Sequence, residues 1–464
     1  MKRYLLVFIV AVLTVTVNAQ DITGRWNGIL DVMGRKLRIV YNVSRTDSGY
    51  VATMDSPDQG AKGIPVLKTT YNAPDIKFEL PSLGMVYEGK FENDTISGVF
   101  RQSGFEFPLD LTRTEAVAVK PNRPQEPKPP FPYYSEDVKF ENRKDSIVLA
   151  GTLTLPDKKG RYPAVILISG SGSQNRDEEI MGHKPFLVLA DHLTRHGIAV
   201  LRFDDRGAGD SGGDAKNATT LDFADDVMAA VSYLNTRKEI DKMHIGLIGH
   251  SEGGMIAPIV ANRINKIDFI VLMAAPGVRG AELLMQQQAA ISRAMGMTDE
   301  YIAKTESINK KLYELILEIR DIDALKKELK AYLKEVLPGL TGTETIQGMS
   351  IDEYADMQVK QLTSPWMLYF IRYDPVPVLE NVKCPVLAIN GSKDLQVSPE
   401  NLDAIRKALE RGGNSDVIVK ELPGLNHLFQ ECQTGLPAEY STIEQTFSPE
   451  ALDVITNWIL QHVK

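Results

Sequence analysis

The chain has 464 residues, which is more than one ordinary domain holds and predicts two or three domains. Apolar residues make up 43% of it and charged residues 24%, as in an ordinary soluble globular protein. The formal net charge is −9, and no Lys/Arg-rich run interrupts this acidic balance, so nucleic acid is not an expected partner.

The N-terminus has the pattern of a secretory signal peptide. Lys2 and Arg3 precede a short apolar run at residues 5–13, and the V-N-A sequence at 17–19 suits a signal peptidase. The run is too short to span a bilayer, and no later run is long enough. We therefore expect residues 1–19 to be removed, leaving an exported protein without a membrane anchor, in the periplasm or the medium of a bacterium.

Residues 20–115 are expected to form a small all-β domain. Apolar and polar residues alternate at 37–43 and at 105–111, and turn signals such as the D-S-G sequence at 47–49 separate the runs. Several short strands joined by tight turns predict a small barrel or sandwich. The G-R-W sequence at 24–26 resembles the opening motif of lipocalin-like barrels, and its tryptophan is expected to close the β core rather than to bind a ligand.

The next segment, residues 116–134, carries six prolines and predicts an extended, semi-rigid linker. From residue 135 onward strands and helices alternate, which predicts a mostly parallel sheet. The expected strands are apolar runs at 164–168, 199–203, 245–248, 269–273, 386–389 and 417–422. A Ser-Pro-Glu start at 448–450 predicts a last helix that ends near His462.

Residues 277–374 break this alternation, because they show helical patterns and no convincing strand. They lie between two predicted strands, so we expect a helical cap insertion over the active edge of the sheet. The insertion divides the α/β domain into residues 135–276 and 375–464. Its charged stretch at 326–334 is expected to be a solvated helix face.

The strongest chemical signal is a G-x-S-x-G sequence at 249–253, centred on Ser251. An apolar strand precedes it and an apolar helical pattern follows, which is the context of a nucleophile elbow. A serine in such a turn has a strained backbone, and the glycines are needed because a Cβ two residues either side would collide with neighbouring backbone. A second match, centred on Ser211, resembles the serine segment of trypsin-like proteases. Polar residues follow it in an α/β region, so Ser211 is predicted to be a loop residue, and the D-D-R-G sequence at 204–207 a structural turn.

A serine hydroxyl is a poor nucleophile without a base, and the base needs an orienting acid. In this kind of fold the chain order is serine, acid, histidine. Asp394 and His427 each follow a predicted strand, so both lie in loops at strand C-terminal ends. We therefore predict a triad of Ser251, Asp394 and His427.

Charge that develops on the attacked carbonyl oxygen needs preorganised N–H donors. One expected donor is the backbone N–H of Glu252, directly after the nucleophile. The other comes from the Gly/Ser-rich loop after the strand at 164–168, where Ser171 is the better candidate and Gly172 the next.

No cofactor and no metal site are predicted. His192 and His196 share a helix face, but no Glu follows His192 as it does in zinc proteases. The two cysteines are Cys384 and Cys432. An exported protein is able to form a disulfide between them, but a domain of this size does not need one, and the distance between them does not follow from the sequence.

With these residues assembled, the chain resembles the serine aminopeptidase/monoacylglycerol-lipase-like branch of the α/β-hydrolases, in the layout of exported esterases that carry a β domain ahead of the hydrolase. The matching segments lie within residues 135–464 and include G-S-G-S-Q at 170–174, F-D-D-R-G at 203–207, the Ser251 elbow and L-N-H-L-F at 425–429. One departure is Ser169, where many relatives have histidine, and it affects support of the loop more than the N–H donors.

The resemblance implies an α/β-hydrolase fold with a serine nucleophile and leaves the substrate open. Family peptidases hold an acidic residue that grips the amino end of the substrate. The insertion offers Glu282, Asp299 and Glu300 for that role, and the sequence does not choose among them.

The favoured function is a carboxylesterase that hydrolyses short- or medium-chain acyl esters, small molecules, through an acyl-enzyme on Ser251. The alternative is a serine peptidase, either an aminopeptidase or a relative of prolyl oligopeptidase, although the N-terminal region is too short for the propeller of the latter. A binding protein on an inactive scaffold is the third hypothesis, and the complete triad argues against it. The oligomeric state stays open. Insertion residues that form either an acyl pocket or cap core are Met285, Met295, Trp366, Met367 and Phe370.

Overall fold

The computed structural model describes residues 21–32, 35–47, 49–59, 61–102, 105–115, 122–264, 266–341, 345–346 and 349–464. The chain divides into two compact units. Of the described residues, the β unit holds those within 21–32, 36–115 and 346–349, and the α/β unit holds residue 35 and those within 122–345 and 350–464. The predicted signal peptide and the first part of the linker, residues 116–121, lie outside the described residues.

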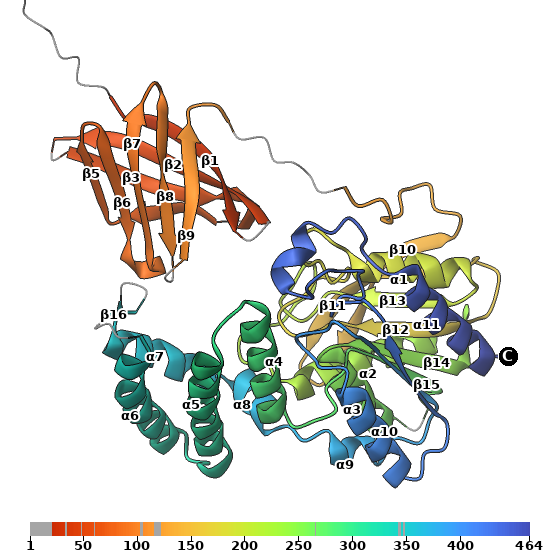
Figure 1. Ribbon diagram of the computed structural model, residues 1–464. Coiled ribbons are helices and arrows are strands. Elements are labelled where there is room, and N and C mark those ends of the chain that lie inside the picture. The colour runs from red at the N-terminus through yellow and green to blue at the C-terminus, as the bar shows by residue number, and fades with distance from the viewer. Residues whose placement is uncertain are drawn as a thin grey trace, which may run out of the picture. The chain divides into compact units, whose positions relative to one another are not determined.

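The β unit is an antiparallel sheet of nine strands, so the predicted all-β domain is confirmed (Figure 1). Its strands are β1 (Gly24–Val32), β2 (Arg35–Thr46), β3 (Gly49–Ser56), β4 (Ala61–Val66), β5 (Lys68–Asn72), β6 (Asp75–Leu80), β7 (Met85–Glu92), β8 (Thr95–Gln102) and β9 (Phe105–Thr112), with short 3-10 helices η1 (Pro57–Gln59) and η2 (Pro81–Leu83). The spatial order is β4-β3-β2-β1-β9-β8-β7-β6-β5, and β3 also lies against β5, so the sheet is nearly closed and barrel-like.

Side chains fill the inside of this sheet. Trp26 is fully buried, its ring meets the Phe91 ring edge to face, and its Nε1 donates a hydrogen bond to the carbonyl oxygen of Ile22. Tyr41 stacks on Phe78 in the same core. The tryptophan of the G-R-W sequence therefore closes the β core, as predicted.

The α/β unit contains an eight-stranded sheet with the order β10-β11-β13-β12-β14-β15-β18-β19. Its strands are β10 (Tyr134–Asn142), β11 (Ile147–Leu155), β12 (Tyr162–Ile168), β13 (Ala199–Phe203), β14 (Ile240–His250), β15 (Phe269–Met273), β18 (Val386–Gly391) and β19 (Val417–Leu422). The six strands from β12 onward pair in parallel and coincide with the six predicted runs. The antiparallel pair β10 and β11 was not among the predicted strands.

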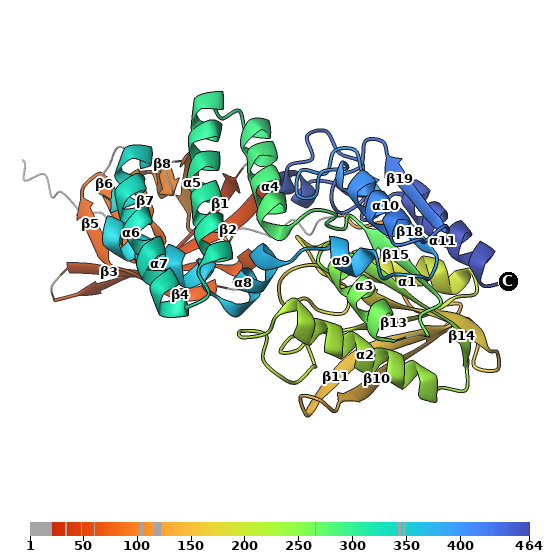
Figure 2. The same ribbon diagram turned by 90° about the horizontal axis from the view of Figure 1, so that it is seen from below.

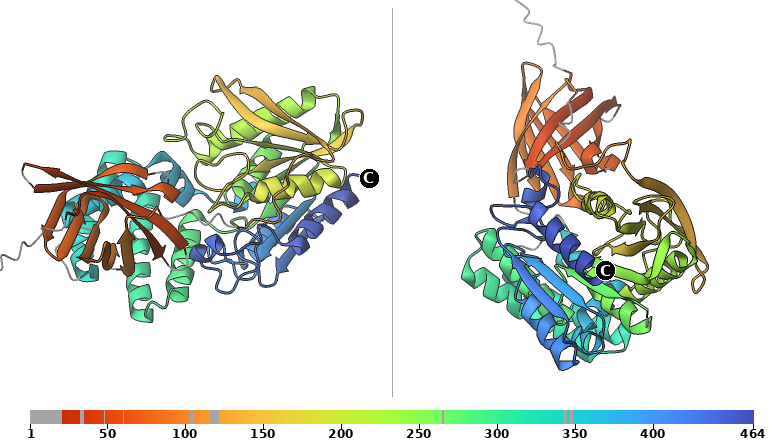
Figure 3. Two further views of the ribbon diagram at one scale, coloured as in Figure 1. Left: turned by 90° about the horizontal axis from the view of Figure 1, so that it is seen from above. Right: turned by 90° about the vertical axis from the view of Figure 1, so that its right-hand side faces the viewer.

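Helices cover both faces of this sheet and bury a separate core on each (Figure 3). One face carries α1 (Pro185–Arg195) and α11 (Pro449–His462), and the other carries α2 (Thr220–Thr236), α3 (Gly253–Arg263) and α10 (Asn401–Arg411). Two short helices, α9 (Val376–Leu379) and η3 (Pro437–Ser441), lie in connections. The last helix begins and ends where the sequence predicted.

The insertion between β15 and β18 is helical, as predicted, and its helices group together (Figure 2). They are α4 (Gly280–Ala294), α5 (Asp299–Glu318), α6 (Ile322–Thr341), α7 (Ile351–Leu362) and α8 (Pro365–Arg372). One detail differs from the prediction, because the two-residue strands β16 (Thr345–Ile346) and β17 (Met349–Ser350) pair between α6 and α7. On α6, Leu325, Leu329 and Leu333 are buried, whereas the lysines of the charged stretch lie at or near the surface, which confirms the solvated helix face.

The second part of the predicted linker is bound to the α/β unit. The Arg123 guanidinium donates hydrogen bonds to backbone carbonyl oxygens of Met181 and Ile443, and the Gln125 amide nitrogen donates to that of Phe447. Residues from 122 onward therefore form a strap on this unit, whereas the proline content predicted an extended, semi-rigid spacer. The contacts come from the side chains of Arg123 and Gln125, whose partners lie far away in the sequence and leave no local pattern.

Cys384 and Cys432 are both free thiols in the structure. Within the described ranges, none of the helices combines the length and the apolar character that crossing a bilayer requires.

Candidate active site

Ser251 lies in a strained turn between β14 and α3. Its φ angle is +53°, which places a residue with a side chain in the left-handed region. A Cβ on Gly249 would lie 2.1 Å from the carbonyl oxygen of Gly253, and a Cβ on Gly253 would lie 2.2 Å from that of Ile168. Both glycines are therefore required by close backbone approach, as the G-x-S-x-G pattern predicted.

Parallel register explains why the candidate residues meet at one edge. Ile168 at the end of β12 pairs with Gly249 near the end of β14, so the loop after β12 and the elbow begin side by side. Asp394 follows β18, and His427 follows the neighbouring strand β19. The carboxyl ends of these strands share one edge, where ligands of open α/β sheets bind.

The predicted acid and base are in direct contact. His427 Nδ1 lies 2.8 Å from Asp394 Oδ2, and both side chains are buried. The other oxygen, Oδ1, accepts hydrogen bonds from the backbone N–H groups of Gln396 and Val397, at 2.8 and 2.9 Å. The carboxylate is thereby fixed and holds the proton on Nδ1 of His427, which leaves Nε2 available to accept a proton.

Ser251 and His427 line the same cavity, which has a volume of about 320 Å³. One wall comes from the cap and is mainly apolar. It includes Leu283 and Leu284 on α4 and Trp366 and Phe370 on α8, together with the polar Gln287 on α4. The facing wall includes Met181 and Leu428 together with uncharged polar side chains such as Gln396. The cap therefore closes over the sheet edge that carries Ser251.

The insertion residues that the sequence offered for this pocket divide into two groups. Trp366 and Phe370 line the cavity, with stacked rings whose centroids are 5.1 Å apart. Met285, Met295 and Met367 are not among the described residues that line it.

The acidic candidates for gripping a substrate amine lie elsewhere. Glu282, Asp299 and Glu300 are exposed and are not among the described residues that line the cavity. Glu178 is the one acidic side chain among those lining residues. Its Oε1 already accepts a hydrogen bond from the backbone N–H of Gly170 and lies 2.9 Å from His250 Nδ1.

Of the three predicted oxyanion-hole residues, Ser171 lines the cavity with Ser251, whereas Gly172 and Glu252 line a smaller neighbouring cavity. Among the described residues, no acceptor pairs with the backbone N–H of Ser171 or of Glu252. Gly170 packs against the nucleophile, because a Cβ on it would lie 3.1 Å from Ser251 Cβ. The loop after β12 is thus held beside the serine with free N–H donors.

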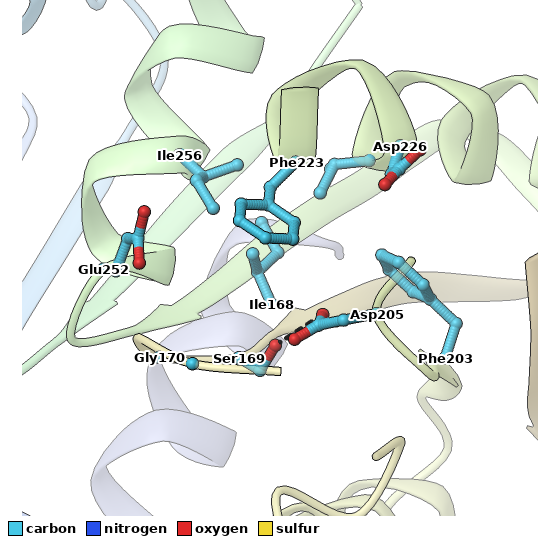
Figure 4. A pocket seen from close by; sticks show the side chains of 11 residues that line it. Ile168, Ser169, Gly170, Phe203, Asp205, Phe223, Asp226, Glu252 and Ile256 are labelled. Carbon is cyan, nitrogen blue, oxygen red and sulfur yellow. Dashed lines mark hydrogen bonds between the residues drawn. The ribbon is translucent and has the colours of Figure 1, made fainter. Parts of the chain in front are cut away.

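Asp205 holds both ends of this loop. Its Oδ1 accepts a hydrogen bond from Ser169 Oγ at 2.8 Å (Figure 4). Its Oδ2 accepts one from the backbone N–H of Gln174 at 2.9 Å. Burial raises the pKa of Asp205 to about 7. The D-D-R-G turn, predicted only as a structural turn, therefore supports the oxyanion loop through Ser169, the residue that departs from the family pattern.

Glu252 and Asp226 also line the small cavity below the elbow that Figure 4 shows. Burial raises the pKa of Glu252, and hydrogen bonds from Thr220 and Trp366 oppose that rise. Trp366 Nε1 lies 2.9 and 3.0 Å from the two oxygens of Glu252, so this indole joins the cap to the residue after the nucleophile.

The competing sequence matches have structural explanations. Ser211 Oγ donates a hydrogen bond to the carbonyl oxygen of Asp204 at 2.7 Å and accepts one from the backbone N–H of Ala150 at 2.9 Å, so it is a loop residue. His192 and His196 lie side by side, but the described part of the chain holds no group of three or more side chains suited to a metal ion.

Two buried residues of the site, Glu178 and His250, were not assigned by the sequence. His250 is the variable position of the elbow, and Glu178 stands in a loop among other acidic residues. The one available signal was a titratable side chain inside the elbow, which usually has a partner when it is buried.

A parallel sheet covered by helices, with a serine elbow and with an acid and a histidine after its last two strands, defines the class of α/β-hydrolases. Residues 184–432 match the family described as "Serine aminopeptidase, S33", and the chain belongs to this family. It is therefore a serine hydrolase.

Several known proteins are similar to this chain. "Esterase EstD" of Thermotoga maritima is 26% identical over 333 residues, which cover 71% of this chain and 70% of EstD. The solved structure of the esterase Pf2001 of Pyrococcus furiosus is 18% identical with a TM-score of 0.43 and covers 74% of this chain and 98% of its own. That of the hypothetical protein PA2218 from Pseudomonas aeruginosa is 17% identical with a TM-score of 0.44 and covers 75% and 99%.

Proposed function

We propose that this protein is a carboxylesterase that hydrolyses small esters of short or medium acyl chains. Ser251 attacks the ester carbonyl while His427 Nε2 takes its proton, and Asp394 stabilises the resulting imidazolium. His427 then protonates the leaving alcohol, and a water molecule activated by the same histidine releases the acyl group from Ser251. The backbone N–H groups of Glu252 and Ser171 stabilise the oxyanion.

The observation that carries this proposal is the character of the cavity beside Ser251. Its cap wall is mainly apolar, and Glu178, the acidic side chain among the described lining residues, is already bonded within the protein, which suits an acyl chain and a neutral ester. Its volume of about 320 Å³ is at the small end for ligand pockets, which supports short or medium chains over long ones.

The same cavity favours an esterase over an aminopeptidase. An aminopeptidase needs a carboxylate that pairs with the charged amino end of its substrate. Glu178 is the acidic side chain among the described lining residues, and its Oε1 is bound to Gly170 and His250. The similarity to a relative named as an esterase agrees with this choice.

We also propose that the protein is exported in a bacterium. The support is the pattern of residues 1–19, with basic residues, a short apolar run and a small residue at the cleavage point. N-terminal sequencing of protein recovered from the periplasm or the medium tests this proposal, and it fails if the chain stays in the cytoplasm with residues 1–19 attached.

The test of the proposed activity is a comparison of two substrate panels. One contains p-nitrophenyl esters from acetyl to dodecanoyl, the other aminoacyl p-nitroanilides, and Ser251→Ala serves as the background in both. We expect kcat/KM to be highest for short or medium acyl esters and hydrolysis of the anilides to stay near the background. Efficient cleavage of the anilides would establish the peptidase instead, and no turnover of either panel would favour a binding protein.

A further inference from the structure

His250, the last residue of β14, makes two hydrogen bonds inside the protein. Its side chain is buried, with 3% of the residue surface exposed. Its Nε2 lies 2.9 Å from the backbone carbonyl oxygen of His427, and its Nδ1 lies 2.9 Å from Oε1 of Glu178. Glu178 is equally buried, at 1% exposure, and neither residue has a role in the proposed triad.

The partners of His250 determine where its protons are. A carbonyl oxygen only accepts hydrogen bonds, so Nε2 must carry a proton. Glu178 Oε1 also accepts the backbone N–H of Gly170, at 2.6 Å, so this oxygen already acts as an acceptor. The Gly170 bond is as short as charge-assisted hydrogen bonds are, which favours an ionised Glu178 and therefore a proton on Nδ1 as well. The network is therefore satisfied by an imidazolium beside a carboxylate.

From this geometry we infer that His250 is a permanently protonated positioning residue, paired with Glu178, that links three segments of the active site. The inference rests on the proposed function, since it concerns the same catalytic machinery. Glu178 holds Gly170 in the oxyanion loop, His250 belongs to the nucleophile elbow, and the carbonyl oxygen of His427 fixes the loop that carries the base.

The bridge acts directly on the placement of the reacting groups. Gly170 packs on Ser251 and precedes Ser171, whose N–H is a proposed oxyanion donor, so movement of Glu178 would displace that donor. The rings of His250 and His427 lie 4.8 Å apart between centroids, so the same bridge fixes the base. Misplacement of catalytic groups by about 1 Å typically costs about 10²-fold in rate.

The surrounding charges keep the proton on His250. Burial alone would lower the pKa of His250, but the Glu178 carboxylate outweighs burial and raises it. Asp394 adds a further negative charge at longer range, and Glu178 also interacts electrostatically with Asp205. The neighbouring ring of His427 completes the titratable groups around this bridge.

The direct test is the protonation state of His250 in the whole protein. The chain has seven histidines, and selective ¹⁵N labelling with NMR distinguishes protonated from bare ring nitrogens in each. The His250→Asn variant assigns the signal. At about pH 8 we expect both ring nitrogens of His250 to carry protons in the wild type and in Ser251→Ala, and one of them to be bare in Glu178→Gln. A bare ring nitrogen on His250 in the wild type would overturn the inference, whether or not the protein proves to hydrolyse esters.

Kinetics separate positioning from a purely structural role. We expect Glu178→Gln and His250→Asn each to lower kcat for p-nitrophenyl butyrate by about 10²-fold and to change KM less than about twofold. The kcat of the double variant should be no lower than that of the more severe single variant. Glu179→Gln, an exposed neighbour, is the matched control and should keep wild-type kcat. Additive losses, or a change confined to the melting temperature, would contradict a positioning role. If no ester is turned over, the rate of labelling of Ser251 by a fluorophosphonate replaces kcat.

Discussion

Replacing Asp205 by asparagine removes one buried charge and keeps the two contacts that hold the oxyanion loop. The amide oxygen of asparagine is able to accept the backbone N–H of Gln174, as Oδ2 of Asp205 does. Its NH₂ group is able to donate to Ser169 Oγ, which now donates to Asp205 Oδ1. The variant therefore isolates the effect of the charge on stability.

The size of that effect follows from the raised pKa of Asp205. Burial raises this pKa from 3.8 to about 7 in the folded protein. Between pH 3.8 and about pH 7 the folded protein then binds more protons than the unfolded chain. The contribution of Asp205 to the free energy of unfolding is therefore fully present at low pH and is lost as the pH rises towards 7. A tenfold change in proton affinity corresponds to about 1.4 kcal/mol. Raising the pH from about 5 to about 8 should therefore lower the free energy of unfolding of the wild type by roughly 2–3 kcal/mol through Asp205.

Urea unfolding of wild type and Asp205→Asn at the two pH values measures this difference. We expect the variant to gain stability relative to the wild type as pH rises. Asp205→Ala is the matched control, because it removes the charge and both contacts and should also lower kcat as the loop carrying Ser171 relaxes. A stability difference between wild type and Asp205→Asn that is the same at both pH values, or smaller at the higher one, would refute the raised pKa.

Three further predictions concern the cap, the strap and the triad. Trp366→Ala should enlarge the cavity and shift kcat/KM towards longer acyl chains by about 10–200-fold per methylene accommodated. Trp366→Phe should keep the chain-length profile and lower the melting temperature, because Glu252 loses its hydrogen bond from the indole N–H. Equal chain-length profiles for Trp366→Ala and the wild type would exclude Trp366 from substrate selection. Deleting residues 20–119 should leave a protein that still melts cooperatively by circular dichroism. Deleting residues 20–133 also removes Arg123, which binds the backbone carbonyl of the cavity residue Met181, and should therefore lower the melting temperature and raise KM. Identical behaviour of the two truncated proteins would argue against the strap. His427→Ala should lower kcat as severely as Ser251→Ala, with no further loss in the double variant, and additive losses would contradict a shared mechanism.

Features that depend on local pattern could be predicted from the sequence. The central strands β12, β13, β15 and β18 are buried along most of their length, so each appears as a largely apolar run. The elbow imposes its glycines through backbone collisions, which makes Gly249 and Gly253 visible around Ser251. The acid and the base follow from chain order and from their places after β18 and β19.

Features that depend on partners distant in sequence could not be predicted. β10 does show the alternation of polar and apolar residues that is typical of a strand, and it was missed because the strands of this domain were predicted from continuous apolar runs; glycine and threonines interrupt the apolar run of β11. The bond between Glu178 and His250 joins residues 72 positions apart, and that between Trp366 and Glu252 joins residues 114 apart. Neither spacing leaves a periodic signal, so only the folded structure shows these contacts.

Covalent labelling shows directly whether Ser251 is the nucleophile. A fluorophosphonate probe reacts with an activated serine, and mass spectrometry of the digested adduct identifies the residue that carries it. Ser251 lies in the strained elbow and lines the cavity with His427, whereas the hydroxyl of Ser211 is bound by Asp204 and Ala150. We expect the adduct on Ser251 in the wild type and in Ser211→Ala, and no adduct in Ser251→Ala of unchanged melting temperature. An adduct on Ser211, or labelling that survives Ser251→Ala, would contradict the account.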